Sequence, residues 1–181
     1  MPARILLAAL LLLAAPACSR AQAAPPEPQP HFPALTGRVV DQADMLTPAE
    51  EQVLTAESAA VERDTKAQYV IATVRSLEGY PIEEYGYKLG RFWGIGRKGV
   101  NDGVILLVAP AERKVRIEVG YGLEKRITDP FAATVIRDRI LPDFHRGDFG
   151  DGIKAASDAI VQRLRSKASD AEIAKEDHLT V

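Results

Sequence analysis

Carboxylates are the side chains in this 181-residue sequence whose type and position could do chemistry. Several stand where a predicted helix or strand begins or ends: Asp41, Asp44, Asp102, Glu124 and Asp129. Carboxylate oxygens are the ligands that hard cations such as calcium and magnesium prefer. Structural alternatives exist, because Asp129 before a proline can cap a helix, Asp102 in an Asn-Asp-Gly run can form a turn, and Asp44 can be solvated. The spacing alone leaves both interpretations open.

Motifs of common hydrolases and nucleotide-binding proteins are absent or misplaced. The run 94–99 reads G-x-G-x-x-G, but it follows a predicted helix and precedes a strand, whereas a dinucleotide site needs the reverse order. We interpret these glycines as a turn and expect no nucleotide cofactor. Neither G-x-S-x-G nor H-E-x-x-H occurs, and the histidines are scattered, which disfavours serine hydrolases and zinc peptidases. A formal net charge of -2 gives no general attraction for nucleic acid, so none is expected as a partner.

Four helices are expected to position these residues. Cap-and-proline signals at Thr47-Pro48 and at Asp129-Pro130 begin two of them, and Pro142 is expected to end the second. A helix that starts at Pro81 carries an apolar face that we expect to include Phe92 and Trp93. The last helix has apolar residues at helical spacing from 153 to 164.

The strands are expected between these helices, at residues 69–74, 104–108 and 115–119. The second is apolar throughout, as in a strand covered on both faces. The third alternates apolar and charged residues, which predicts one solvent-facing side, and its short connection to the second favours an antiparallel hairpin. The fold class is therefore α/β, a three-layer α/β/α sandwich around a small mixed sheet.

The N-terminus has the features of a signal peptide over residues 1–23. A positive charge at Arg4 precedes an apolar run that ends at Pro16, short of the roughly 20 residues that a membrane span needs. Small residues favour cleavage between Ala23 and Ala24, and the alternative is lipid attachment at Cys18, the only cysteine. We therefore expect a periplasmic or secreted protein without a transmembrane span in the mature chain, or a lipoprotein tethered through Cys18.

The rest of the chain divides into three parts. Residues 24–34 are rich in proline, which favours an extended linker. Residues 35–166 form one domain of a size that buries a core. Residues 167–181 are polar and are expected to form a fraying tail.

Five pieces of this domain, taken in order, resemble the TPM domain family. They are residues 39–43 with Leu46-Thr47, Phe92–Gly96, Asn101–Val104, Arg113–Glu124 and Asp129. The run Val119-Gly120-Tyr121-Gly122-Leu123-Glu124 after an alternating strand is the most specific of them. The chain departs from many relatives in having no second hydrophobic span and no glycine-rich tail.

The resemblance implies a cleft at loop ends in which acidic residues hold a divalent cation, calcium or alternatively magnesium. The residues carried over as ligands are Asp41, Asp102, Glu124 and Asp129. Turns at Gly103, Gly120 and Gly122 would let the backbone approach a ligand. The expected function is an accessory or assembly module of the cell envelope that recognises a membrane protein or another envelope partner. The alternative is a metal-dependent acid phosphatase of low specificity, and no nucleophile is identified for it.

Overall fold

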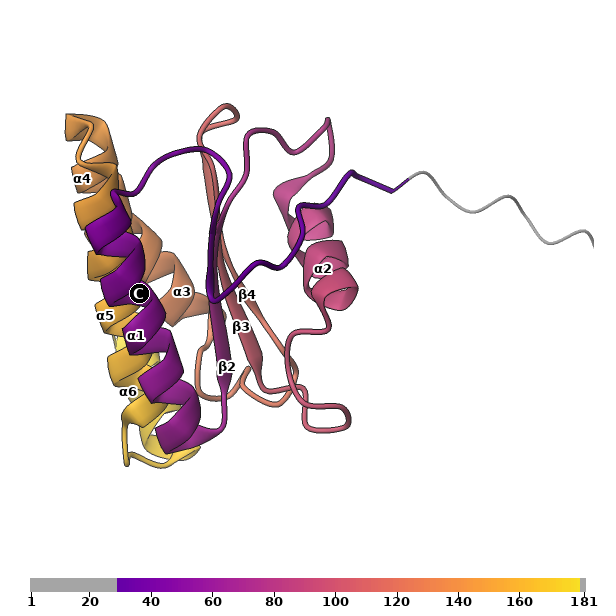
Figure 1. Cartoon of the computed structure of the whole chain (residues 1–181). Coiled ribbons are helices and arrows are strands. Elements are labelled where there is room, and N and C mark those ends of the chain that lie inside the picture. The colour runs from indigo at the N-terminus through magenta and orange to yellow at the C-terminus, as the bar shows by residue number, and fades with distance from the viewer. Residues whose placement is uncertain (1–28, 180–181) are drawn as a thin grey trace, which may run out of the picture.

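A computed structural model of the chain describes residues 29–179 (Figure 1). The predicted signal peptide, the cleavage position Ala23-Ala24 and the alternative lipidation site Cys18 lie outside the described residues. The strands are β1 (Val39–Asp41), β2 (Gln68–Thr73), β3 (Gly103–Ala109) and β4 (Lys114–Val119). The helices are α1 (Pro48–Thr65), α2 (Ile82–Trp93), α3 (Asp129–Val135), η1 (Ile136–Ile140), α4 (Leu141–Arg146), α5 (Phe149–Arg165) and α6 (Asp170–Leu179).

The four strands form one mixed sheet in the order β1-β2-β3-β4. Strands β1, β2 and β3 run parallel, and β4 returns antiparallel to β3, so the predicted hairpin is confirmed. The parallel connections bring the carboxyl ends of β1 and β2 to one end of the sheet, where Asp41 pairs with Thr73. The amino end of β3 lies at the other end, where Gly103 pairs with Gln68.

Helices cover both faces of the sheet and give the three layers that the sequence predicts. Helix α2 lies on one face, and α1 lies with the later helices on the other (Figure 1). Every residue of β3 is buried, because this strand lies between β2 and β4 and beneath helices on both sides. Burial of apolar side chains in two cores, one per face, is the main stabilising contribution.

The start of α1 follows the predicted pattern. Thr47 is the N-cap residue, and its hydroxyl accepts a hydrogen bond from the Glu50 amide at 3.3 Å. The Glu50 carboxylate in turn accepts from the Thr47 amide at 2.7 Å. This reciprocal pair satisfies two amides that the first helical turn leaves without partners.

Helix α3 and the segment after it differ from the prediction. Thr128, not Asp129, is the N-cap residue, and its hydroxyl accepts from the Phe131 amide at 3.3 Å. Asp129 is the first residue of the helix, so its carboxylate is not used in the cap. Pro142 does not end the helical path, because η1 is a π-helical turn that precedes it and closes with a bond from the Leu141 amide to the Ile136 carbonyl. This wider turn accommodates a proline that an α-helix would exclude.

Two further expectations about burial are corrected. Phe92 is 61% exposed and does not join the buried face of α2, whereas Trp93 is partly buried and its indole donates to the Pro33 carbonyl at 2.8 Å. The segment expected to fray contains helix α6, in which Ile173 is 1% exposed. Its single buried apolar residue and its polar contacts gave no helical periodicity that sequence inspection could detect.

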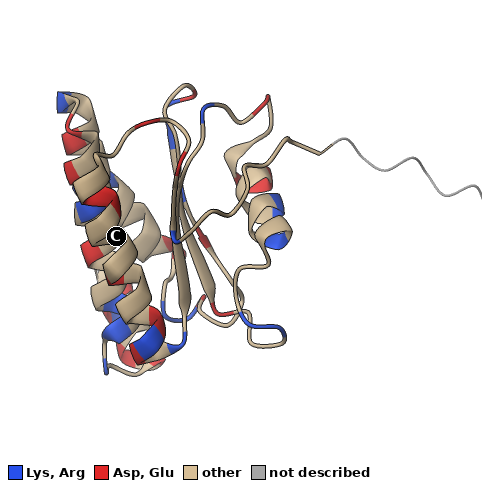
Figure 2. Ribbon diagram, in the orientation of Figure 1, with Lys and Arg blue, Asp and Glu red and all other residues tan. Residues whose placement is uncertain are grey.

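Among residues 29–179, no helix combines the length and the apolar content that crossing a bilayer would require. Charges of both signs are interspersed over the helices and loops (Figure 2).

Candidate functional site

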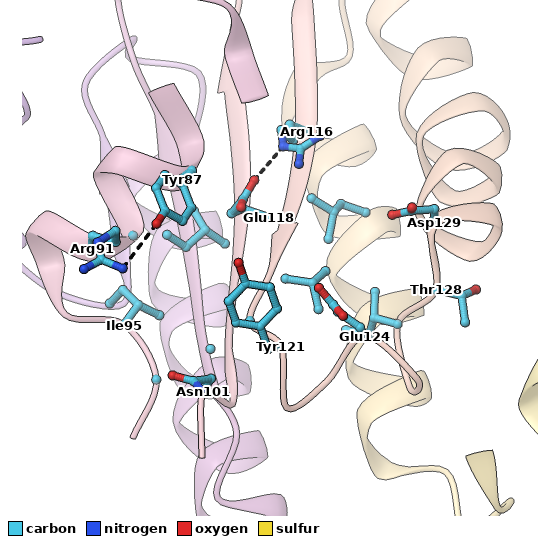
Figure 3. A pocket seen from close by; sticks show the side chains of 18 of the residues that line it. Tyr87, Arg91, Ile95, Asn101, Arg116, Glu118, Tyr121, Glu124, Thr128 and Asp129 are labelled. Atoms are coloured by element: carbon cyan, nitrogen blue, oxygen red, sulfur yellow. Dashed lines mark hydrogen bonds and ion pairs between the residues drawn. The ribbon is translucent and has the colours of Figure 1, made fainter. Parts of the chain in front are cut away.

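A cleft of about 790 Å³ opens beside β4, at the free edge of the sheet. Its floor is the stretch from Arg116 to Tyr121. One wall is the C-terminal half of α2 with the turn that follows, and the other is the loop that leads into α3 (Figure 3). The cleft therefore joins residues from α2, β4 and the start of α3, three elements that are separate in sequence.

Charged side chains on the α2 side of the cleft are mostly paired. The Arg116 guanidinium contacts the Glu118 carboxylate at 2.6 Å, and both side chains project toward α2 from alternate positions of β4 (Figure 3). There they lie against Gly86, which has no side chain to displace them. Arg91 donates to the Tyr87 hydroxyl at 3.2 Å. The face of β4 that was expected to be solvated is thus half covered by α2.

The opposite wall presents two carboxylates, Glu124 and Asp129 (Figure 3). Both are exposed, and neither makes a hydrogen bond or ion pair with another residue of the described part of the chain. The amide side chain of Asn101 lines the cleft near its lower end and adds a neutral oxygen. These groups offer oxygen donors of the kind that bind hard cations.

Asp102 stands between Asn101 and Gly103, which line the cleft, but its own carboxylate holds a turn. It is 4% exposed, and Arg97 contacts it three ways: the backbone amide at 2.8 Å, Nε at 2.7 Å and an amino group at 2.5 Å. Burial raises the pKa of Asp102, but the Arg97 hydrogen bonds and charge outweigh burial and hold the pKa below its usual value. Its carboxylate closes the turn before β3 and does not line the cleft.

Asp41 lies at the other end of the sheet. Its carboxylate accepts hydrogen bonds from the amides of Met45 and Leu46, at 3.1 and 2.8 Å, and from the Thr73 hydroxyl. Strand β2 separates this end from the Asp102 end by roughly 16 Å, at 3.3 Å per residue. The structure therefore brings Glu124 and Asp129 together in one cleft and leaves Asp41 far from them.

No group of three or more His, Cys, Asp or Glu side chains in residues 29–179 has an arrangement that would hold a metal ion. A cation at the cleft would consequently depend on Glu124 and Asp129, with Asn101 and water completing its shell. The four-carboxylate site that the family resemblance suggested is not assembled by the described residues.

The glycines of the predicted turns meet the chain's own backbone. A Cβ atom on Gly120 would lie 2.2 Å from the Asn101 carbonyl oxygen, and one on Gly122 would lie 2.1 Å from that of Val100. A Cβ on Gly103 would meet Ile95 at 2.7 Å. These positions need glycine because the loops before β3 and after β4 pack backbone to backbone at the lower end of the cleft.

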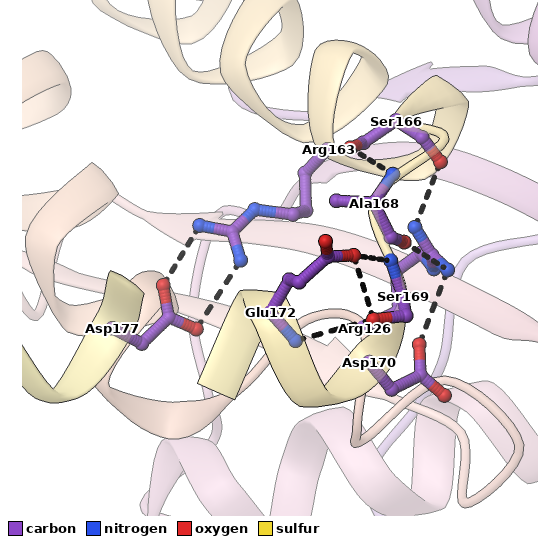
Figure 4. Close-up of polar contacts among 8 residues, drawn as sticks. All are labelled: Arg126, Arg163, Ser166, Ala168, Ser169, Asp170, Glu172 and Asp177. Atoms are coloured by element: carbon purple, nitrogen blue, oxygen red, sulfur yellow. Dashed lines mark hydrogen bonds and ion pairs between the residues drawn. The ribbon is translucent and has the colours of Figure 1, made fainter. Parts of the chain in front are cut away.

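Helix α6 and the segment before it anchor the loop that carries Glu124 and Asp129, and Figure 4 shows the contacts of Arg126 and Arg163 that do so. Arg126 donates to the carbonyls of Ser166 and Ala168 and to the Asp170 carboxylate, at 2.9, 3.2 and 3.1 Å. Asp177 binds Arg163 through both carboxylate oxygens, at 2.8 and 3.2 Å, and also accepts from the Thr128 hydroxyl. The loop that carries Glu124 and Asp129 is thus anchored on both sides of Ile127.

Sequence reasoning missed several residues that line the cleft, among them Tyr87, Arg91, Arg116, Glu118 and Tyr121. Arg116 and Glu118 were visible as the charged positions of an alternating strand, and Tyr121 stood in the Gly-Tyr-Gly turn. These residues meet in one cleft because α2 covers that face of the sheet. The alternation of apolar and charged residues in β4 does not reveal which helix covers the face.

The fold and the cleft together define a class of small α/β domain with a mixed four-stranded sheet and a cleft lined by charges of both signs at its antiparallel edge. Residues 39–163 match the TPM domain. The chain belongs to the TPM domain family, as its sequence motifs suggested. No curated protein matches it.

Three solved structures are similar to the chain. The N-terminal domain of a protein from P. gingivalis is 32% identical, with a TM-score of 0.67 over 71% of this chain and 82% of that one. The N-terminal domain of the cg2496 protein from Corynebacterium glutamicum is 16% identical, with a TM-score of 0.57 over 78% and 87%. The BA42 protein from Bizionia argentinensis is 19% identical, with a TM-score of 0.56 over 67% and 83%. The last two likenesses concern the fold alone.

Proposed function

We propose that this TPM domain is an exported accessory module of the cell envelope that binds a divalent cation, calcium first, in the cleft beside β4. The observation that carries the proposal is that Glu124 and Asp129 face the cleft without a protein partner in the described chain. A bound cation would give both carboxylates the oxygen-ligand role that no protein group in the described chain takes. Among the described residues that line the cleft there is no serine, cysteine or histidine, and the Thr128 hydroxyl is used to cap α3, which favours binding over catalysis.

The donor set suits weak binding. Calcium takes six to eight oxygen ligands, and the cleft supplies two carboxylates and the Asn101 amide. Water would provide the remainder, so we expect a Kd of about 10⁻⁴ to 10⁻³ M, the range of extracellular calcium modules. Such a site would be filled outside the cytoplasm, where calcium is abundant, which agrees with the proposed export.

Calorimetric titration of the full-length protein with calcium tests the cation site. Glu124→Gln and Asp129→Asn should each weaken binding by about tenfold or more, equivalent to 1.4 kcal/mol. Asp44→Asn is the matched control, because it removes one carboxylate that is 85% exposed at the other end of the sheet. Equal effects of all three variants, or no heat of binding for the wild type, would refute the cation site.

Export is tested separately by fractionating cells that express the full-length protein and measuring the mass of the mature form. A mature chain that begins at Ala24 supports release into the periplasm or medium. A lipid-modified chain that begins at Cys18 would support tethering, and an intact chain in the cytoplasm would exclude export.

Phosphate monoester hydrolysis is the alternative function. Arg91, Lys98 and Arg116 lie in the same cleft as the acidic pair, and a cation beside such side chains would provide an anion site. Hydrolysis of p-nitrophenyl phosphate that requires calcium or magnesium and disappears in Glu124→Gln would establish it. Asp102→Ala is unsuitable for this test, because Asp102 holds the turn before β3. If the wild type hydrolyses the substrate no faster than Glu124→Gln does, the phosphatase alternative is excluded and the binding function is retained.

A further inference from the structure

The floor of the cleft is the open edge of a β-sheet. Among residues 29–179, no strand pairs with the outer edge of β4. The Gly120 amide donates to the Gly103 carbonyl at 2.8 Å, so Gly103 and Gly120 form a hydrogen-bonded pair of the antiparallel hairpin. Along β4, hydrogen-bonded and non-hydrogen-bonded residues alternate from this pair onward. The backbone amides and carbonyls of Ile117 and Val119 therefore point outward, and both residues line the cleft.

An open edge with unpaired backbone groups binds an extended chain. Sheet edges are commonly protected by a cover, short length, proline or charged side chains. Strand β4 has six residues and no proline, and two of its charged side chains, Arg116 and Glu118, pair with each other against α2 and leave the backbone edge open. The floor from Arg116 to Tyr121 has about the length of a six-residue strand, roughly 20 Å. The cleft volume of about 790 Å³ lies in the range of sites that enclose ligands.

The two walls differ in charge, and this difference restricts the occupant. A strand added to β4 would direct alternate side chains to the two faces of the sheet. On one face its side chains would meet Glu124 and Asp129, which have no hydrogen-bond or ion-pair partner among residues 29–179. On the other face they would meet the α2 wall, where Arg91 and Lys98 are the cationic residues besides the paired Arg116.

We propose that the cleft binds an extended peptide segment of a protein partner as a fifth strand on β4. Basic side chains of the peptide face Glu124 and Asp129, and the acidic side chains between them face Arg91 and Lys98. The inference rests on the accessory part of the proposed function and names the class of partner. It does not require a cation.

The probe is a capped hexapeptide in which lysine and glutamate alternate, titrated into the isotopically labelled full-length protein in a chelator. The largest amide shifts are expected at Val115, Ile117 and Val119, on the outer edge of β4. A block peptide of three lysines followed by three glutamates has the same net charge, but as a strand it would direct lysines and glutamates to both walls alike. It should bind about tenfold more weakly.

Backbone pairing is tested by N-methylation. A strand paired on one edge directs only alternate amides to its partner. Methylating either the three lysine amides or the three glutamate amides should therefore abolish binding, while methylating the other set should not. Antiparallel addition predicts sensitivity of the lysine set, and parallel addition predicts sensitivity of the glutamate set. Equal behaviour of the two methylated peptides, or shifts away from β4, would overturn the proposal.

Because chelator is present throughout, failure of peptide binding leaves the calcium titration unaffected. Conversely, absence of calcium binding leaves the strand-addition test intact.

Discussion

The Thr128 hydroxyl, which caps helix α3 in the wall of the cleft, donates a hydrogen bond to Asp177, 49 residues later in helix α6. The same carboxylate binds Arg163, whose guanidinium lies 3.9 Å from the centre of the Phe131 ring. Residues beyond the segment that matches the family thus hold the start of α3 in place. Helix α6 is therefore part of the domain and supports its acidic wall.

Removing the Asp177 carboxylate should destabilise the protein strongly. The side chains of Arg163 and Asp177 are only 13% and 8% exposed, so Asp177→Ala leaves a nearly buried guanidinium without its counter-ion. We expect a loss of about 3 kcal/mol in the free energy of unfolding, measured with urea. Asp170→Ala removes a carboxylate that is 49% exposed and should cost no more than about 1 kcal/mol. Similar losses of unfolding free energy in Asp177→Ala and Asp170→Ala would contradict the expectation that the less exposed ion pair matters more.

The Asp177 contribution should depend on pH. Burial raises the pKa of Asp177, but the hydrogen bonds from Arg163 and Thr128 outweigh burial and lower the pKa below its usual value. A lowered folded-state pKa stabilises the protein above the unfolded-state value, about 3.9, and this contribution is lost as the pH falls through the folded-state pKa. The stability difference between wild type and Asp177→Asn should hold from pH 7 to 5 and shrink below about pH 4. A constant difference would argue against this role.

Glu57 should behave in the opposite way. Burial between α1 and α5 raises its pKa, and Asp158 raises it further, although the Ser157 hydroxyl at 2.7 Å partly compensates. A raised folded-state pKa means that ionisation disfavours the folded state above the unfolded-state value. Glu57→Gln keeps an acceptor for Ser157 and should raise the melting temperature at pH 7. The gain should shrink as the pH falls through the unfolded-state value of about 4.3 and vanish near about pH 3, where Glu57 is protonated in both states. A gain that persists there would have another cause.

Gly120→Ala should disrupt the lower end of the cleft. Its Cβ would lie 2.2 Å from the Asn101 carbonyl oxygen, so the two loops must separate. We expect a loss of about 2 to 3 kcal/mol in unfolding free energy, comparable with overpacking a core. Gly37→Ala is the control, since its Cβ would lie at an ordinary 3.8 Å from the nearest atom. Wild-type stability in Gly120→Ala would show that the loops adjust freely.

Asp102 and Glu124 should separate stability from binding. Asp102→Ala leaves Arg97 unpaired and should lower the free energy of unfolding by about 1 to 3 kcal/mol. Calcium affinity, measured where that variant remains folded, should change little. Glu124→Gln should show the reverse, with near wild-type stability and weakened binding, because the exposed Glu124 makes no hydrogen bond or ion pair within the described chain. Equal loss of calcium binding in both variants would return Asp102 to the ligand set.

Most of the architecture could be predicted from local signals. The cap at Thr47, the apolar run of β3 and the alternation of β4 each report an interaction within a few residues. One prediction failed at a place where the local helical geometry is unusual. Pro142 was expected to end a helix because proline excludes an ordinary turn, and the π-helical turn before it removes that conflict.

The candidate site was harder to predict. The sequence shows that a carboxylate follows or precedes a strand or helix, but it does not show at which end of the sheet that carboxylate lies. Asp41, Asp102, Glu124 and Asp129 look alike in sequence as carboxylates near loops. Parallel pairing of β1, β2 and β3 places Asp41 at one end of the sheet and Asp102 at the other. Only Glu124 and Asp129 reach the cleft.

The sequence by itself determined the family, the layered α/β fold and the hairpin, since periodicity and turn residues act over short stretches of chain. Tertiary structure alone decided which carboxylates share the cleft. Asp41 and Asp102 bind groups close to them in sequence, but the parallel pairing of β1, β2 and β3 sets them at opposite ends of the sheet. Glu124 and Asp129 line the same cleft as α2 and β4 because folding brings these elements together, and sequence separation does not measure that distance.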